Sequence, residues 1–321
     1  MSSLNIAEEM GVVAPERTAT ATHLTRPFLW SLRRELWENP TIIGAPIVIA
    51  SIAILTILFT LLRATGPFLI QLNGRNIEPS SIGVLPLLPV PFVLGVTMLG
   101  VAIFYSLDAL LSERQDRTIL FWKSLPVSDT TTVLSKVAIP MLVLPVVTFV
   151  LAVVSEVAIF IIETLALLTH HASVSSAWAS IPVLSLFGLM AYTLVVVTLW
   201  YAPIYAWCLL VSAWARRAPL LWAVIPFFVL AFFEKIAFRT HHVIDFIKNR
   251  FAGVFPAAFT SGYMTDGHNH DLVAYSGGSP LSSAIWTPGH FLATPALWLG
   301  LLFTALALFL IIRLRRSSGP I

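Results

Sequence analysis

Six long, almost uninterrupted runs of apolar residues divide the chain, and a helix needs roughly 20 such residues to cross about 30 Å of hydrocarbon. The runs lie at about 42–62, 85–111, 137–168, 180–213, 219–237 and 294–312. Several contain prolines, which membrane helices tolerate where neighbouring helices or water satisfy the freed carbonyls. These prolines are Pro91, Pro140, Pro145, Pro203 and Pro226. We therefore predict an all-α integral membrane protein with six kinked transmembrane helices packed in one bundle.

The composition supports this class. Of the 321 residues, 57% are hydrophobic and 11% are charged, whereas soluble domains carry about 25% charged residues. This balance argues against a soluble enzyme, a disordered protein and a nucleic-acid-binding domain. The single cysteine, Cys208, lies in an apolar run, which excludes a disulfide framework and a multi-cysteine metal or redox site. Residues 1–25 contain three glutamates and no apolar core, so we expect a polar tail and no cleavable signal peptide.

The distribution of basic residues predicts the orientation. An even number of spans places both termini on one side. That side receives 13 of the lysines and arginines and the other side receives 6, which accounts for all 19. The positive-inside rule therefore places both termini in the cytoplasm, including a short C-terminal tail at 314–321.

An amphipathic helix is predicted at 26–40, ahead of the six-span domain at 41–313. One face carries Phe28, Leu29, Leu32 and Leu36, and the opposite face carries Arg34, Glu35 and Glu38. Trp30 and Trp37 suit the headgroup level of a bilayer. The pattern favours a helix lying in the inner membrane interface. The alternative is a cytosolic extension of the first span.

The cytoplasmic loop at 112–136 combines charged residues with a compact apolar group at 119–122. Large apolar side chains on a cytosolic loop need a partner. We expect the loop to dock onto another protein, with a position against the bilayer as the alternative. Pro126 ends the apolar segment, and Ser128 or Asp129 is placed to cap the next helix.

The predicted extracytoplasmic segment at 238–293 is much longer than a simple connection. Its apolar stretch Phe251–Phe259 is too short to span the membrane and predicts re-entrant or interfacial helices. His268, His270 and Asp271 are of a type that binds divalent metals. No further ligand follows these residues at a defined spacing, so we assign no metal site.

Two carboxylates, Glu156 and Glu163, lie seven residues apart in the third apolar run and share a helix face. Carboxylates are costly in lipid and usually face the bundle interior or water. They form a candidate intramembrane polar site, either as a cavity lining or as a proton-accepting pair. Alternatively, Glu163 is solvated near the outer end and Glu156 hydrogen-bonds a neighbouring helix.

Motifs for nucleotide hydrolysis and other enzyme chemistry are missing from the sequence. None of the four lysines follows a glycine, and Lys123 alone precedes a serine or threonine, so there is no P-loop. The sequence also lacks H-E-x-x-H and G-x-S-x-G motifs and a basic patch interleaved with aromatic residues. We expect no enzymatic activity, no cofactor and no nucleic-acid partner for this chain, so any ATP would be hydrolysed by another subunit.

The run LDALLSERQDRTILFWKSLPVSD at Leu107–Asp129 resembles the loop after the second span in a subfamily of ABC-2 type transporter permeases. The six spans, the amphipathic helix and the long outer segment fit that family. The resemblance implies a bacterial inner-membrane exporter made of two permease chains, most simply a homodimer, and two P-loop ATPase subunits that bind ATP and Mg. It also implies that 112–136 carries a coupling helix and that Phe251–Phe259 belongs to an outer gate.

The resemblance assigns the ATPase-docking role to one set of residues in this loop. Polar contacts are expected from the charged members, and the apolar members would fill a groove in the ATPase or anchor the segment beneath the bundle. The set comprises Glu113, Arg114, Asp116, Arg117, Ile119, Leu120, Phe121, Trp122 and Lys123.

A permease of this kind would pass substrate outward along a largely apolar path at the dimer interface, surrounded by membrane lipid. Such a path favours a hydrophobic cargo such as a lipid, a peptide or a drug. Two alternatives come from other classes. One is a proton-coupled secondary transporter that uses Glu156 and Glu163, although the internal symmetry expected of such transporters is not evident. The other is a non-transporting membrane scaffold or sensor.

Overall fold

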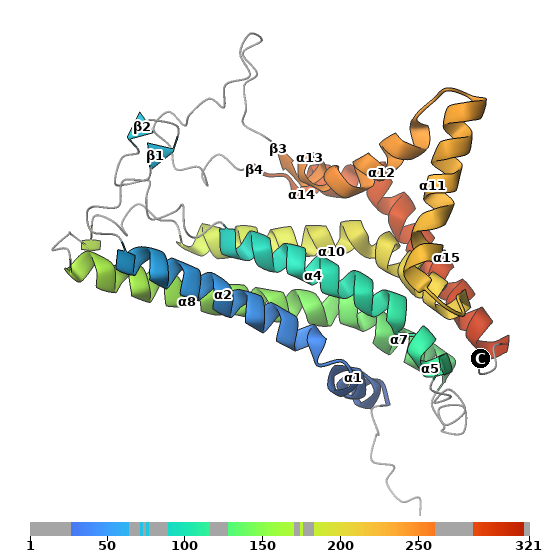
Figure 1. Ribbon diagram of the computed structural model, residues 1–321, viewed down its shortest axis with the longest axis horizontal. Coiled ribbons are helices and arrows are strands. Elements are labelled where there is room, and N and C mark those ends of the chain that lie inside the picture. The colour runs from blue at the N-terminus through green and yellow to red at the C-terminus, as the bar shows by residue number, and fades with distance from the viewer. Residues whose placement is uncertain are drawn as a thin grey trace, which may run out of the picture.

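The computed structural model describes residues 27–63, 71–72, 75–76, 89–115, 128–169, 174–175, 183–260 and 285–317, which are mostly helical (Figure 1). Its longer helices are α2 (Thr41–Arg63), α4 (Pro89–Asp108), α8 (Leu144–Thr169), α10 (Val183–Trp214), α11 (Pro219–Ala237) and α15 (Pro295–Ser317). Its shorter helices are α1 (Pro27–Glu38), α5 (Leu111–Gln115), α7 (Asp129–Ala138), the π-helix η1 (Ile139–Val143), α12 (His242–Ala252), α13 (Val254–Ala258) and α14 (Pro288–Ala293). Four two-residue strands are also present. Strand β1 (Gln71–Leu72) pairs antiparallel with β2 (Arg75–Asn76), and β3 (Phe259–Thr260) pairs antiparallel with β4 (Ile285–Trp286).

Six helices in the described ranges are long and apolar enough to cross a membrane, which confirms the predicted all-α class and its six spans. The chain is therefore a multi-pass membrane protein. The spans cover Thr41–Thr60, Val90–Gln115, Asp129–Ala166, Val183–Trp214, Pro219–Ala237 and Pro295–Arg316.

The bundle is built around α2, α4, α8 and α10, which lie side by side along the long axis of the molecule (Figure 1). Helix α15 packs against α10, and α11 stands at the periphery, where it contacts α10, α4 and α12. Trp200 and Tyr205 of α10 and Met98 of α4 are buried in the largest core cluster. The outer faces carry exposed apolar side chains, including Phe104 and Phe228. An apolar exterior of this kind suits a bilayer or a second membrane chain.

The third span begins earlier than its apolar run, because α7, η1 and α8 follow one another without a break from Asp129. The last part of the region expected as a loop is therefore helical. Ser128 caps α7 by accepting a hydrogen bond from the Thr131 amide, which is one of the two caps predicted. In η1 the Leu144 amide donates to the Ile139 carbonyl, five residues back. Pro140 lies inside this wide turn and Pro145 directly after it, and neither has an N–H.

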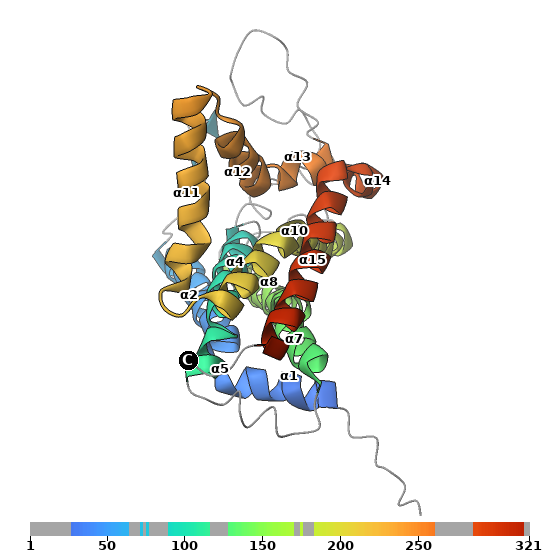
Figure 2. The ribbon, with the colours of Figure 1, turned by 90° about the vertical axis from the view of Figure 1, so that its right-hand side faces the viewer.

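Helix α1 lies across one end of the bundle, where α5, the start of α7 and the end of α15 also meet (Figure 2). Leu32 and Leu36 pack against the main core, while Trp30 and Trp37 are exposed. The prediction that Glu35 lies on the face of α1 opposite its apolar residues is wrong. Its side chain points inward and is 2% exposed, because partners on α4 and α7 satisfy its charge.

At the opposite end, α12, α13 and α14 form the short helices expected before the last span (Figure 2). Two tyrosines of α10 hold them: Tyr201 donates to the Phe251 carbonyl at 2.6 Å, and Tyr192 donates to the Ala258 carbonyl at 3.0 Å. The Glu234 carboxylate at the end of α11 accepts hydrogen bonds from the His242 and Val243 amides. It thereby caps the start of α12, since these amides have no partner within the helix.

Candidate functional site

A buried charged cluster occupies the end of the bundle where the two described parts of the 112–136 region, 112–115 and 128–136, lie. Its core members come from α1, α5, α7 and α15, and four of them are at most 6% exposed. The cluster contains three carboxylates and three cationic groups. They are Glu35, Glu113 and Asp129, and Arg34, Lys136 and Arg315.

Lys136 and Glu113 form the centre of this charged cluster. The Lys136 ammonium lies 2.8 Å from Glu35 Oε1 and 3.2 Å from Glu113 Oε1. The Arg315 guanidinium lies 2.7 Å from Glu113 Oε2 through Nη1 and 3.1 Å from Asp129 Oδ1 through Nε. Arg34 Nη1 is 3.9 Å from Glu113 Oε1. Each buried charge therefore has an opposite charge within 4 Å, as burial of ionised groups requires.

Tyr105 extends the charged cluster into α4, because its hydroxyl donates to Glu35 Oε2 at 2.8 Å. Lys136 and Tyr105 thus bind different oxygens of the same carboxylate. Removing one partner from a buried ion pair costs about 3–5 kcal/mol, because the remaining charge stays buried without compensation. The cluster consequently fixes the positions of the helices that contribute to it.

The start of the 112–136 region is also attached to the end of α10. Ser212 Oγ accepts hydrogen bonds from the Leu110 and Leu111 amides, both at 3.0 Å. Arg114 Nη1 donates to the Ala213 and Ala215 carbonyls at 2.8 and 3.1 Å. These are carbonyls at a helix C-terminus, which a cationic side chain satisfies well.

The nine residues predicted to dock an ATPase divide into two groups. Glu113 and Arg114 lie at the base of the bundle and bind other parts of this chain. The remainder lie outside the described residues, so their role stays a prediction. They are Asp116, Arg117, Ile119, Leu120, Phe121, Trp122 and Lys123. The candidate ligands His268, His270 and Asp271 also lie outside the described residues.

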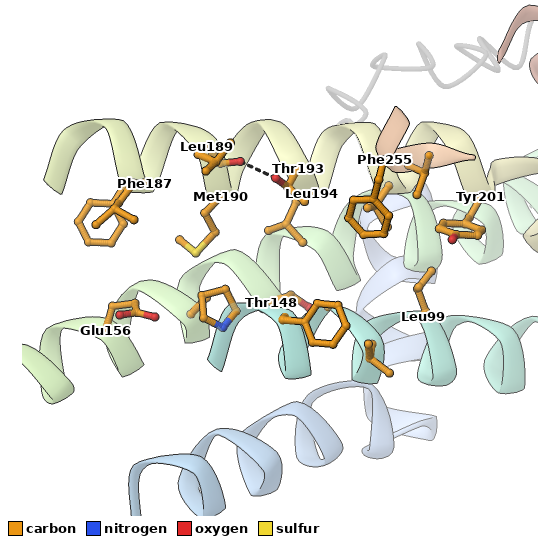
Figure 3. A pocket seen from close by; sticks show the side chains of 18 of the residues that line it. Leu99, Thr148, Glu156, Phe187, Leu189, Met190, Thr193, Leu194, Tyr201 and Phe255 are labelled. Carbon is orange, nitrogen blue, oxygen red and sulfur yellow. Dashed lines mark hydrogen bonds between the residues drawn. The ribbon is translucent and has the colours of Figure 1, made fainter. Parts of the chain in front are cut away.

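Glu156 lines a cavity of about 820 Å³ between α4, α8, α10 and α13 (Figure 3). The residue is 4% exposed, and neither of its oxygens has a hydrogen-bond partner in the described part of the chain. The expected hydrogen bond from Glu156 to a neighbouring helix is therefore not formed there. Glu163 is partly exposed and does not line this cavity. Of the two carboxylates that the sequence paired, Glu156 lies in the cavity wall and Glu163 lies outside it.

Arg250 of α12 is a further polar residue, half-buried between helices. Its guanidinium lies 4.9 Å from the centre of the Trp200 ring and donates to the Trp200 and Ala296 carbonyls. Burial lowers the pKa of Arg250, which still lies far above neutral pH because the guanidinium is such a strong base. Arg250 thereby joins α12 to both α10 and α15.

Sequence reasoning missed Lys136, Arg315, Glu35 and Arg250 as interacting residues. In the sequence, Lys136 and Arg315 contribute only to the excess of positive charge that predicts the orientation. A weak signal existed for Glu35: at 100° per residue it lies about 20° from Phe28 on a helical wheel, beside the apolar face. No such local signal marks the partners, because Lys136 and Glu35 are 101 residues apart.

No protein-family model, curated protein or solved structure matches this chain. The resemblance to ABC-2 type permeases therefore depends on the residues of the 107–129 segment and on the arrangement of the helices.

Proposed function

We propose that the chain is the permease subunit of an ATP-driven ABC-2 type exporter in a bacterial inner membrane, acting as a homodimer. A separate P-loop ATPase subunit would bind ATP with Mg and hydrolyse it. This chain would supply the translocation path for a hydrophobic cargo and no catalytic residue. The observation that supports the proposal best is the buried charged cluster, which ties both ends of the 112–136 region to the bundle.

The charged cluster is suited to transmitting movement of the 112–136 region to the helices of the bundle. Glu113 stands at the start of the 112–136 region, and Asp129 and Lys136 stand at its end, yet all three pair with α1 or α15 or with each other. A partner that displaced this region would therefore move α1, α10 and α15 together with it. In this proposal Glu113 and Arg114 anchor the coupling region, and the residues from Asp116 to Lys123 make the contact with the ATPase.

Helix α15 provides a continuous connection to the opposite end of the protein. Arg315 belongs to the charged cluster, and the Ala296 carbonyl accepts a hydrogen bond from Arg250 of α12. These two positions are 19 residues apart, or about 28 Å along a helix. Motion at the cytoplasmic end would reach the short outer helices α12 and α13 through one rigid element, and rigid helices are one of the means by which distant sites are coupled.

Co-purification from native membranes tests this function. The tagged protein is isolated in mild detergent, co-purifying chains are identified, and ATP hydrolysis is assayed. We expect a P-loop ATPase with the wild type and its loss with the double variant Phe121→Asp plus Trp122→Asp. Phe246→Asp is the matched control, because Phe246 is an exposed aromatic residue on α12, away from the 112–136 region. It should retain the ATPase.

Absence of any ATPase from the wild-type preparation, also after crosslinking in the membrane, would contradict the proposal. The proton-coupled alternative would then be tested by measuring proton-driven flux for Glu156→Gln and Glu163→Gln. A complex that turns over ATP normally but moves no hydrophobic cargo would instead support the scaffold or sensor alternative.

A further inference from the structure

The cavity beside Glu156 is almost entirely apolar. Phe92 and Val96 of α4 and Phe255 of α13 contribute to its wall and are half-exposed or more, so the cavity opens onto an apolar surface of the protein. Its volume of about 820 Å³ lies within the range of pockets that hold small organic molecules, roughly 300–1,000 Å³. A ligand of this cavity must therefore be largely hydrophobic, and it can enter from the lipid.

Four polar side chains line the cavity, and two of them already have partners. Thr193 donates to the Leu189 carbonyl, and Tyr201 donates to the Phe251 carbonyl. Thr148 and Glu156, both on α8, are buried and have no hydrogen-bond partner among the residues that the structure describes. They are eight residues apart, or about 12 Å along the helix, and both line the cavity.

The Glu156 carboxylate needs a compensating group. A buried carboxylate is strongly unfavourable unless it is paired and hydrogen-bonded. The lining residues include no lysine, arginine or histidine, so the described wall of the cavity supplies no cation. A cationic ligand can provide the missing charge, and the apolar wall can hold its hydrocarbon groups.

We propose that this cavity binds a lipophilic organic cation, with Glu156 as its counter-ion. The surrounding apolar surface selects for hydrophobic groups, and the single carboxylate selects for positive charge. The proposal concerns binding by this chain alone and holds whether or not an ATPase partner exists. If Glu156 instead stays protonated, the cavity would prefer an uncharged molecule, and the charge of the ligand would have no effect on its affinity.

Binding of radiolabelled tetraphenylphosphonium to the full-length protein in lipid nanodiscs tests the proposal. Tetraphenylborate, an anion of the same shape, is the matched probe. We expect saturable binding of the cation, at least ~10-fold tighter than that of the anion, and at least ~10-fold weaker cation binding by Glu156→Gln, as for the loss of one charge contact. Glu163→Gln, which removes a carboxylate outside the cavity, should bind the cation within about threefold of wild type.

A second pair of variants tests the location without changing charge. Gly95 lines the cavity and has no atom within 4 Å of an added Cβ, so the Leu side chain of Gly95→Leu would enter open space. Gly100 on the same helix has equal room but does not line the cavity. We expect Gly95→Leu to weaken cation binding at least ~10-fold and Gly100→Leu to leave it unchanged.

Three results would overturn the proposal: equal affinity for both probes, unchanged binding by Glu156→Gln, or equal losses for Glu156→Gln and Glu163→Gln. Each variant is compared only if it elutes as the wild type does and unfolds at a similar or higher temperature. Gln is isosteric with Glu and removes a buried charge, so Glu156→Gln is expected to fold.

Discussion

Trp200 and Arg250 each donate a side-chain hydrogen bond to the backbone carbonyl of the other residue. The Trp200 indole donates to the Arg250 carbonyl at 2.8 Å, while the Arg250 guanidinium covers the indole ring and donates to the Trp200 carbonyl. The pair joins α10, in the centre of the bundle, to α12, one of the short helices before the last span. A cation over a desolvated indole is worth about 2 kcal/mol, in addition to the hydrogen bonds. This contact and the tyrosine hydrogen bonds hold the short outer helices in place.

Gly300 of α15 has no side chain, and this leaves room for the Arg250 guanidinium. An added Cβ at this position would lie 2.5 Å from Arg250 Nη2 and 2.9 Å from Pro203 Cγ. We predict that Gly300→Ala lowers stability by about 1–3 kcal/mol, because crowded cores respond in this way to added groups. Thermal unfolding in detergent, followed by size exclusion, measures the effect.

Gly100→Ala is the control for Gly300→Ala, since nothing lies within 4 Å of an added Cβ at Gly100. Alanine is the better helix former by roughly 0.5–1 kcal/mol, so this variant should unfold at the same or a higher temperature. Equal losses of stability in both variants would show that the crowding at Arg250 is not the cause.

Arg250→Lys should loosen the outer segment although it conserves the charge. An ammonium cannot donate to the Trp200 and Ala296 carbonyls in the planar geometry of a guanidinium while it also stacks on the indole. We expect a loss of about 1–3 kcal/mol in local stability and faster amide hydrogen exchange in α12. Lys248→Gln, at an exposed position two residues away, should leave exchange unchanged.

Lys136→Met should be severely destabilising. Among the described residues, Glu35 would keep only its hydrogen bond to Tyr105, and Glu113 would lose its contact at 3.2 Å. We expect a loss of about 3–5 kcal/mol, typical of a buried ion pair that loses one member. Lys248→Met is the control, because Lys248 and its partner Asp245 are both largely exposed, and it should change stability by less than about 1 kcal/mol.

The double variant Lys136→Met plus Glu35→Gln distinguishes lost charge pairing from lost packing. The glutamine side chain introduced by Glu35→Gln carries no charge and can still accept a hydrogen bond from Tyr105, so part of the stability should return. A double variant as unstable as the sum of its two single changes would contradict a direct interaction between these residues.

Ser128→Ala should weaken the start of α7 by about 1 kcal/mol, because the Thr131 amide loses its acceptor. Ser128→Asp should restore the cap, since aspartate is as good at this position. Hydrogen exchange of the Thr131 amide reports on the cap directly. Unchanged exchange in Ser128→Ala would show that another group can satisfy this amide.

Glu156→Gln should raise the unfolding temperature of the ligand-free protein. The substitution removes a buried charge for which the described residues supply no partner, whereas a neutral amide costs much less to bury. Differential scanning calorimetry of wild type and variant, without any added cation, measures the difference. A lower unfolding temperature for the variant would mean that the carboxylate stabilises the empty cavity.

The six spans could be predicted from the sequence because length and apolarity alone decide which segments can cross a bilayer. The cap at Ser128 followed from local sequence for a similar reason, since it involves a residue and its neighbour three positions on. The charged cluster could not be found in this way. Lys136 reaches Glu35 across 101 positions, and Arg315 reaches Glu113 across 202. Nothing local distinguishes such residues from other charges near the membrane surface.

The two intramembrane glutamates illustrate the same limit. Their spacing of seven residues correctly places them on one side of α8, but it carries no information about the neighbouring helices. Glu156 faces the space left between α4 and α10, whereas Glu163 lies two turns further along and outside that space. The size of the gap depends on how the helices cross, which the apolar pattern of one helix does not specify.

The π-helix η1 sets the rotational phase of the third span. Its Leu144 to Ile139 hydrogen bond encloses one more residue than an α-helical turn. Each residue of an α-helix turns the chain by 100°, so deleting one residue from Ile139–Val143 would swing Thr148 and Glu156 by about 100° relative to Lys136. Lys136 and Glu156 could then no longer face the charged cluster and the cavity at the same time. The one extra residue in η1 thus allows the continuous helix α7–η1–α8 to direct Lys136 into the charged cluster and Glu156 into the apolar cavity.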